Sequence, residues 1–168
     1  MVGTATETDR AWAVLRQVPD PEVPVLSVCD LGIVRAVHVR GRGVDVVLTP
    51  TYSGCPATEV IAQSVHDALA AAGFGPVTLT TRRAPAWTTD WISDEGRRKL
   101  RDYGIAPPSG QAAVHDGAVP IRIQVRGVDC PRCGSPDTER LSAFGSTACK
   151  ALYRCLACRE PFEFFKPI

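Results

Sequence analysis

Two pairs of cysteines near the end of the chain have the spacing of a metal site. Cys130 and Cys133 form one Cys-x2-Cys pair, Cys155 and Cys158 form the other, and 21 residues lie between the pairs. Each pair closes a tight turn that directs two thiolates to one point, so two pairs complete a tetrahedral cage of four sulfur atoms. The spacing predicts a structural zinc site, because four protein ligands leave no open position for a reacting water. Iron would use the same ligands, and redox-active cysteines are a further interpretation.

A single cysteine in the first half of the chain, Cys55, is a candidate metal ligand or nucleophile. It follows Gly54 and precedes Pro56, which fits the first position of a helix. A thiol near the N-cap faces unpaired backbone N–H groups and the positive end of the helix dipole, which stabilise the thiolate. A small residue that packs a tight turn is the alternative, and the local sequence leaves both interpretations open.

Three acidic residues, Asp20, Glu22 and Asp30, lie in or near proline-containing loops, where capping and turn formation are the expected roles. None of the three histidines lies near a matching set of ligands in the sequence. The sequence also contains no convincing Ser-His-Asp arrangement and no glycine-rich phosphate loop. These patterns therefore give no support to an enzyme built on such groups.

The elements that would position these residues follow from hydrophobic periodicity and turn signals. We predict helices over residues 8–18, 57–72 and 94–103, and strands over residues 33–39, 44–49 and 77–82. A strand, a helix and a second strand of this length imply a right-handed crossover within one sheet. The fold class of the first half is therefore predicted as α/β (α+β), a small mixed sheet with packed helices. The second helix should bury an apolar stripe made up of Val60, Ile61, Val65, Ala68, Leu69 and Ala72.

A segment rich in Pro, Gly, Ala and Ser, residues 106–120, divides the chain. We predict a first domain over residues 1–105, this linker, and a β-rich zinc ribbon over residues 121–168. Strands at residues 121–125 and 162–165 should flank the cysteine pairs. A segment as short as the ribbon has little apolar surface to bury, so metal binding should supply much of its folding free energy.

The overall composition disfavours several classes of partner. The 168 residues are 45% hydrophobic and 22% charged with a net charge of +1, which gives no strong attraction to nucleic acid or to an anionic membrane. No apolar run approaches the roughly 20 residues of a membrane-spanning helix, and no secretory signal is recognised. The expected location is the cytoplasm, where seven reduced cysteines favour metal or thiol chemistry over disulfides. The ribbon carries eight basic and five acidic residues, so a protein partner is at least as well supported as nucleic acid.

Two loops of the first half carry motifs of a known family. Asp-Pro-Glu occurs at residues 20–22, Asp-Leu-Gly at residues 30–32, and Thr-x4-Gly-Cys-Pro at residues 49–56, directly before the predicted helix. These motifs resemble those of the small domain of iron–sulfur assembly factors related to SufT and to the cytosolic targeting factor of the MIP family. The resemblance implies that Cys55 handles iron or a cluster. It also implies a supporting loop that comprises Asp20, Glu22, Asp30, Thr49 and Gly54.

Five further segments extend the resemblance over nearly the whole chain, at residues 87–92, 103–108, 144–150, 160–162 and 165–166. In this order they are similar to segments of the PaaD proteins of bacterial phenylacetate degradation. The similarity implies an accessory protein of the multicomponent phenylacetyl-CoA epoxidase, not itself an enzyme, that assists maturation of an iron–sulfur or other metal centre. The reductase component is the expected client, and the oxygenase subunits are further expected partners.

The same similarity leaves an alternative, a structural or adaptor subunit of the epoxidase without cluster handling. The expected cofactors are Zn2+ and a transient iron–sulfur cluster, and a cluster bridging two chains through Cys55 would make a homodimer. The sequence has neither the carboxylate–histidine signature of a di-iron site nor a dinucleotide fingerprint. The chain is therefore not predicted to be the oxygenase or the reductase itself.

Overall fold

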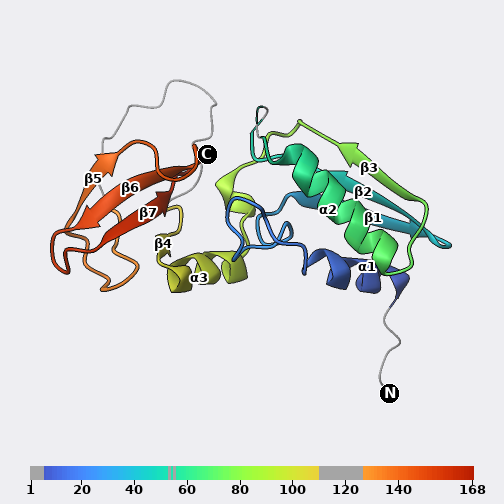
Figure 1. The fold of residues 1–168 in the computed structure, drawn as a ribbon, viewed down its shortest axis with the longest axis horizontal. Helices are drawn as coiled ribbons and strands as arrows, with labels where there is room; N and C mark the ends of the chain where they lie inside the picture. The colour runs from blue at the N-terminus through green and yellow to red at the C-terminus, as the bar shows by residue number, and fades with distance from the viewer. Residues whose placement is uncertain (1–5, 53, 55, 110–126) are drawn as a thin grey trace, which may run out of the picture. The chain divides into compact units, whose positions relative to one another are not determined.

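The computed structural model describes residues 6–52, 54, 56–109 and 127–168 (Figure 1). The chain divides into two compact units, residues 1–96 and 97–168. The strand predicted at residues 121–125 and most of the predicted linker lie outside the described residues, so the domain limits at residues 105 and 120 stay predictions. No helix in the described part of the chain combines the length and the apolar character needed to cross a membrane.

The first unit is built on a three-stranded mixed sheet. β1 (Val34–Arg40) pairs antiparallel with β2 (Gly43–Leu48), and the turn between them passes through Gly41 at a φ of +62°, a left-handed value that favours glycine. β3 (Val77–Thr81) lies parallel to β2, which gives the order β1-β2-β3. The α2 helix (Thr58–Ala71) connects β2 to β3, as parallel pairing requires. The predicted mixed sheet with packed helices is confirmed.

The α1 helix (Glu7–Leu15) begins at a capping box. The hydroxyl of Thr6 accepts from the N–H of Asp9 at 3.1 Å, and the carboxylate of Asp9 accepts from the N–H of Thr6 at 3.0 Å. The helix ends before the predicted end at Val18. The N–H of Val18 donates instead to the carbonyl of Leu15 at 3.2 Å. This i→i−3 bond forms a tighter turn of the 3-10 type, which ends the α-helix.

The α2 helix buries one narrow stripe in the core of the first unit, where it contacts α1 and β3. Ile61, Val65 and Leu69, spaced by four residues, are at most 5% exposed. Val60 is 53% exposed, so its predicted place in the buried stripe is wrong. Successive helical residues are rotated by about 100°, and Val60 therefore projects to one side of a stripe that is only one residue wide at each turn.

The second unit contains an antiparallel ribbon of three strands extended by a short fourth one (Figure 1). β5 (Thr138–Ser142), β6 (Lys150–Cys155) and β7 (Pro161–Phe165) pair in sequence order. The α3 helix (Asp94–Tyr103), which contains the boundary between the units, leads into β4 (Ile105–Ala106). β4 pairs parallel with β7, so the sheet order is β4-β7-β6-β5. The predicted β-rich C-terminal ribbon is confirmed.

Candidate functional site

Each cysteine pair lies on a turn closed by backbone hydrogen bonds. In the first turn the N–H of Gly134 donates to the carbonyl of Cys130 at 2.8 Å, and in the second the N–H of Cys155 donates to the carbonyl of Glu160 at 3.0 Å. The residue after the second cysteine has a left-handed backbone in both turns, with a φ of +74° at Gly134 and +66° at Arg159. Glycine adopts this conformation freely, whereas an arginine does so only when its surroundings hold it there. The two turns thus share one backbone shape despite their different sequences.

The four sulfur atoms meet in one cluster. The Sγ atoms of Cys130 and Cys158 are 3.8 Å apart, those of Cys133 and Cys155 are 3.6 Å apart, and all four lie within 4.8 Å of one another. Four sulfur ligands at about 2.3 Å from a tetrahedral zinc ion would be about 3.8 Å apart. The donor set and its spacing therefore fit a tetrahedral Zn2+ site.

One side of the sulfur cluster belongs to the hydrophobic core of the ribbon. Cys130 and Cys155 are 2% and 0% exposed, and they pack with aromatic residues of β6 and β7. The ring of Tyr153 stacks on Phe162 with centroids 5.8 Å apart and meets Phe164 edge-on at 5.6 Å. A metal ion at this place would therefore join the two turns to the core itself.

The pKa values of two thiols in the cluster are shifted in opposite directions. The N–H of Cys158 donates to the Sγ of Cys155 at 3.5 Å and lowers the pKa of Cys155 to about 7. The N–H of Glu160 favours ionised Cys158, but burial and the neighbouring thiols outweigh it and raise the pKa of Cys158 to about 12. A divalent cation would stabilise the thiolates together, because the thiolate is the form that ligates a metal.

A cavity of about 430 Å3 opens at the start of α2 in the first unit. Cys55 lies outside the described residues, so its predicted role stays a prediction. The helix begins at Thr58 with Ala57 as its N-cap, and the prediction that Pro56 occupies the first helical position is therefore wrong. The first i→i−4 bond runs from the N–H of Ile61 to the carbonyl of Ala57, so Pro56 lies before the helix. The cavity is lined by Pro50, Gly54, Pro56, Thr58, Glu59, Thr81 and Arg83.

Sequence reasoning did not identify Thr81 and Arg83, which line this cavity. Because β3 is parallel to β2, the carboxyl ends of both strands meet at one edge of the sheet. The loop that follows β2 is consequently placed beside the residues that end β3. The predicted strand–helix–strand order was the one available signal, and it does not specify which residues beyond the second strand face the loop.

The carboxylates of Asp20 and Asp30 hold the loops on which they lie. Asp20 Oδ1 accepts from the N–H groups of Glu22 at 2.9 Å and Val23 at 2.8 Å. Asp30 Oδ2 accepts from the N–H and from the hydroxyl of Ser27, each at 2.9 Å. Both aspartates are less than a tenth exposed, and neither lines the cavity at α2. Their charges are therefore stabilised by local donors, as in Asx turns.

The remaining predicted loop residues lie in different environments. Thr49 is 3% exposed just after β2, and its N–H donates to the carbonyl of Ile33 at 2.8 Å. Glu22 is half-buried, and Gly54 is exposed at the cavity. Of the five predicted supporting residues, the structure places only Gly54 in the cavity lining.

Two further cysteines, Cys29 and Cys149, are half-buried and buried. Burial raises the pKa of the half-buried Cys29 to about 11, with a smaller opposing effect from Arg16 and a smaller reinforcing one from Asp30. Cys149 is buried, and its Sγ lies 3.0 Å from the hydroxyl of Thr147. Neither is an exposed thiol with a lowered pKa, which is the usual form of a reactive cysteine.

Both parts of the chain match known families. Residues 8–78 match a family described as an iron-sulfur cluster assembly protein, and residues 118–166 match the PaaD zinc beta ribbon domain, which includes all four clustered cysteines. A crystal structure of a domain of unknown function, DUF59, from Bacillus anthracis is 23% identical with a TM-score of 0.52. The match covers 55% of this chain and 90% of that one, and it concerns the fold alone.

Two relatives are similar in sequence. An Escherichia coli protein, named as a putative subunit of a 1,2-phenylacetyl-CoA epoxidase, is 52% identical over 157 residues, which are 94% of this chain and 91% of that protein. A Porphyromonas gingivalis protein named "Fe-S protein maturation auxiliary factor" is 36% identical over 88 residues, 51% of this chain and 83% of that protein. With both domains matched and with identity over nearly its whole length, the chain belongs to the PaaD family, in which an iron–sulfur cluster assembly domain precedes a zinc beta ribbon.

Proposed function

We propose that this protein is a non-catalytic accessory factor of a phenylacetyl-CoA epoxidase system and helps to mature a metal centre there. The observation that carries the proposal is the joining, in one chain, of an iron-sulfur cluster assembly domain at residues 8–78 and a PaaD ribbon at residues 118–166. The names of the two relatives, one for a part of an epoxidase and one for a maturation auxiliary factor, support the same interpretation. We take the reductase component as the client and the oxygenase subunits as further partners.

In this proposal the ribbon is a structural and docking domain. Cys130, Cys133, Cys155 and Cys158 would hold Zn2+, and four thiolates would leave no position for water or substrate. The ion would fix the two turns against the small aromatic core, and its binding energy would become folding energy of the ribbon. The proposed domain limits are residues 1–105 and 121–168, with a linker between them.

The first domain would act through Cys55, with iron or a cluster as its cargo. The cavity at the start of α2 supports this, because Thr58, Thr81 and the basic Arg83 line it together with Gly54 and Pro56, the residues on either side of Cys55 in the sequence. Asp20 and Asp30 would serve by fixing their loops. One cysteine per chain supplies too few ligands for a cluster, so the cargo would be shared with the client or with a second copy. A cytoplasmic location would keep the thiol reduced.

Metal content tests the separate roles of the two cysteine sites. Wild type, Cys55→Ser and Cys29→Ser would be purified anaerobically and assayed for zinc, iron and sulfide. About one zinc per chain is expected in all three, with iron and sulfide lost only in Cys55→Ser. Cys29→Ser is the matched control, because it removes a thiol of the same domain whose pKa is raised. Equal iron and sulfide in Cys55→Ser and wild type would exclude Cys55 as the carrier.

A second candidate function is a structural or adaptor role in the epoxidase complex without cluster handling. The name of the E. coli relative, which presents it as a part of the epoxidase, and the closed four-cysteine cage favour it. Stoichiometric co-purification with the oxygenase subunits, unchanged in Cys55→Ser, together with zinc but no iron in every variant, would select this function over cluster handling.

A further inference from the structure

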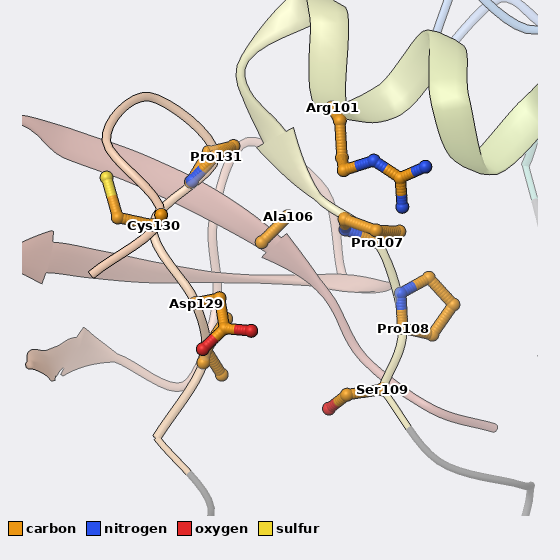
Figure 2. Close-up of a pocket in the computed structure, with 10 residues that line it drawn as sticks. Arg101, Ala106, Pro107, Pro108, Ser109, Asp129, Cys130 and Pro131 are labelled. Carbon is orange, nitrogen blue, oxygen red and sulfur yellow. The ribbon is translucent and has the colours of Figure 1, made fainter. Parts of the chain in front are cut away.

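Two adjoining hollows border the first cysteine turn in the second unit, and Figure 2 shows residues that line the first of them. The first has a volume of about 380 Å3, and its lining includes Ala106, Pro107, Pro108 and Asp129. The second has a volume of about 360 Å3, and its lining includes Tyr103, Gly104 and Arg132. Arg101 and Pro131 line both hollows, so the two adjoin, and we call them together the Pro131 groove.

The first hollow has a rigid apolar floor. Pro107, Pro108 and Pro131 have fixed φ angles, and the guanidinium of Arg97 donates to the carbonyl of Pro108 at 2.9 Å. Ala106 is 2% exposed and is held by β4 pairing with β7. A floor of this kind loses little conformational entropy when a ligand settles on it, which favours binding.

Two guanidinium groups in the Pro131 groove are available to an anion. Arg101 and Arg132 are exposed, and neither guanidinium forms a hydrogen bond or ion pair with another residue in the described part of the chain. Figure 2 shows the side chain of Arg101 descending from α3 toward Pro107, with the carboxylate of Asp129 on the other side of the hollow. Asp102 also lines the second hollow. The groove therefore offers two cationic donors and two carboxylate acceptors.

We propose that the Pro131 groove binds an extended segment of a partner protein. An apolar side chain of the segment would occupy the proline-lined hollow, and a neighbouring acidic side chain would lie between Arg101 and Arg132. The carboxylate of Asp129 would accept a backbone N–H of the segment. Two hollows in succession fit an elongated chain better than a compact ligand, and the pattern of charges suits a polypeptide, which carries N–H donors and carboxylates together. The inference goes beyond the proposed function and does not depend on Cys55.

A peptide titration tests the groove on the full-length, zinc-loaded chain. The probe is an acetylated and amidated hexapeptide with one leucine followed by two glutamates and glycines elsewhere. With a 15N-labelled chain, the amide signals of Gly104, Asp129, Arg132 and Gly134 should shift and saturate. A peptide with glutamines in place of the glutamates should bind about tenfold more weakly, because it lacks the charge-assisted bonds.

Substitutions test whether Arg101 and Arg132 bind the acidic peptide. The double substitution Arg101→Ala and Arg132→Ala should weaken binding of the acidic peptide about tenfold, whereas Arg140→Ala, an exposed arginine of the same unit, should leave it unchanged. The charge-reversed pair Arg101→Glu and Arg132→Glu should instead prefer a peptide with lysines at the two positions, which also shows that the variant is folded. Equal binding of the acidic and neutral peptides would overturn the proposal. It would also fail if no signals shifted at millimolar peptide, or if they shifted with protein concentration alone, as in self-association.

Discussion

The two units of this protein hold their candidate sites by different means. In the second unit four sulfur atoms lie within 4.8 Å of one another, and two of them are part of a small aromatic core. In the first unit the residues that line the cavity at α2 belong to a domain with a core of helices and sheet, and the carboxylates of Asp20 and Asp30 fix other loops of that domain through backbone donors. A metal ion would thus be part of the folded structure of the second unit. Any iron or cluster held by the first unit would be cargo on which the folding of that unit does not depend.

The second unit should therefore owe much of its stability to metal binding, and the first unit should owe its stability to its buried core. In the described part of the ribbon, the core cluster around the cysteines comprises six buried residues, two of them cysteines of the site. A structural zinc would bring about 10–16 kcal/mol of apparent binding free energy at neutral pH. The first unit buries long side chains such as Leu15, Leu26 and Leu69 completely and has no comparable need of a metal.

Removal of the metal should unfold one unit and spare the other. With a zinc chelator, amide hydrogen exchange should accelerate throughout β5, β6 and β7, because the cluster ties both cysteine turns to the ribbon core. Protection in β1, β2 and α2 should remain. Cys155→Ser should reproduce the chelated pattern, since Cys155 is fully buried within the core. The contrast between the units would be wrong if both lost protection together, or if the ribbon kept it.

Truncation of the α2 stripe should destabilise only the first unit. Leu69→Ala should cost about 2–5 kcal/mol of unfolding free energy, because Leu69 is fully buried. Val60→Ala, at an exposed position of the same helix, should change it by less than about 0.5 kcal/mol. All three tryptophans lie in residues 1–96, so tryptophan fluorescence during urea unfolding reports this unit. Zinc content should stay unchanged in both variants, and a similar cost at the two positions would refute the narrow stripe.

Loss of a loop carboxylate should have a smaller effect. Asp30→Ala leaves the N–H and hydroxyl of Ser27 without their acceptor in a buried place, which should cost about 1–3 kcal/mol. Asp67→Ala removes an exposed carboxylate of the same unit and should be nearly neutral. Urea unfolding followed by tryptophan fluorescence compares the two. If Asp30→Ala were as stable as wild type, the structural role of Asp30 would be untenable.

The rate of alkylation should differ between Cys29 and Cys55, the two cysteines of the first unit. With a pKa raised from 9.0 to about 11, Cys29 should have a thiolate fraction at pH 8 roughly 100-fold below that of an ordinary thiol. Its iodoacetamide labelling, followed by mass spectrometry, should therefore be slow at pH 8 and should rise with pH toward 11. If the thiolate of Cys55 is stabilised as its sequence predicts, Cys55 should label much faster at the same pH. Rapid labelling of Cys29 at pH 8 would contradict the effect of its burial.

The parts of the molecule that the sequence predicted are those governed by local spacing. The Cys130–Cys133 and Cys155–Cys158 pairs meet as expected, because a Cys-x2-Cys turn is determined by a few consecutive residues. The position of α2 follows from its apolar period, but Val60 was misplaced because a run of apolar residues does not reveal which of them faces the core.

Features that depend on tertiary placement were not predictable. The contribution of Arg83 to the cavity at α2 requires the parallel pairing of β2 and β3. The two-residue strand β4 has no periodicity to detect, and the Pro131 groove exists only because the segment after α3 lies beside the first cysteine turn. Such contacts join residues that are far apart in the sequence, and a single sequence carries no signal for them.

The most direct test of the proposed accessory role is the cluster content of the reductase. The reductase would be purified anaerobically from cells that lack this protein and are complemented with wild type, Cys55→Ser or Cys29→Ser, and its iron and sulfide would be measured per chain. Nearly full cluster content is expected with wild type and Cys29→Ser, and a strong deficit with Cys55→Ser and without complementation. Full cluster content in every strain would contradict the maturation role.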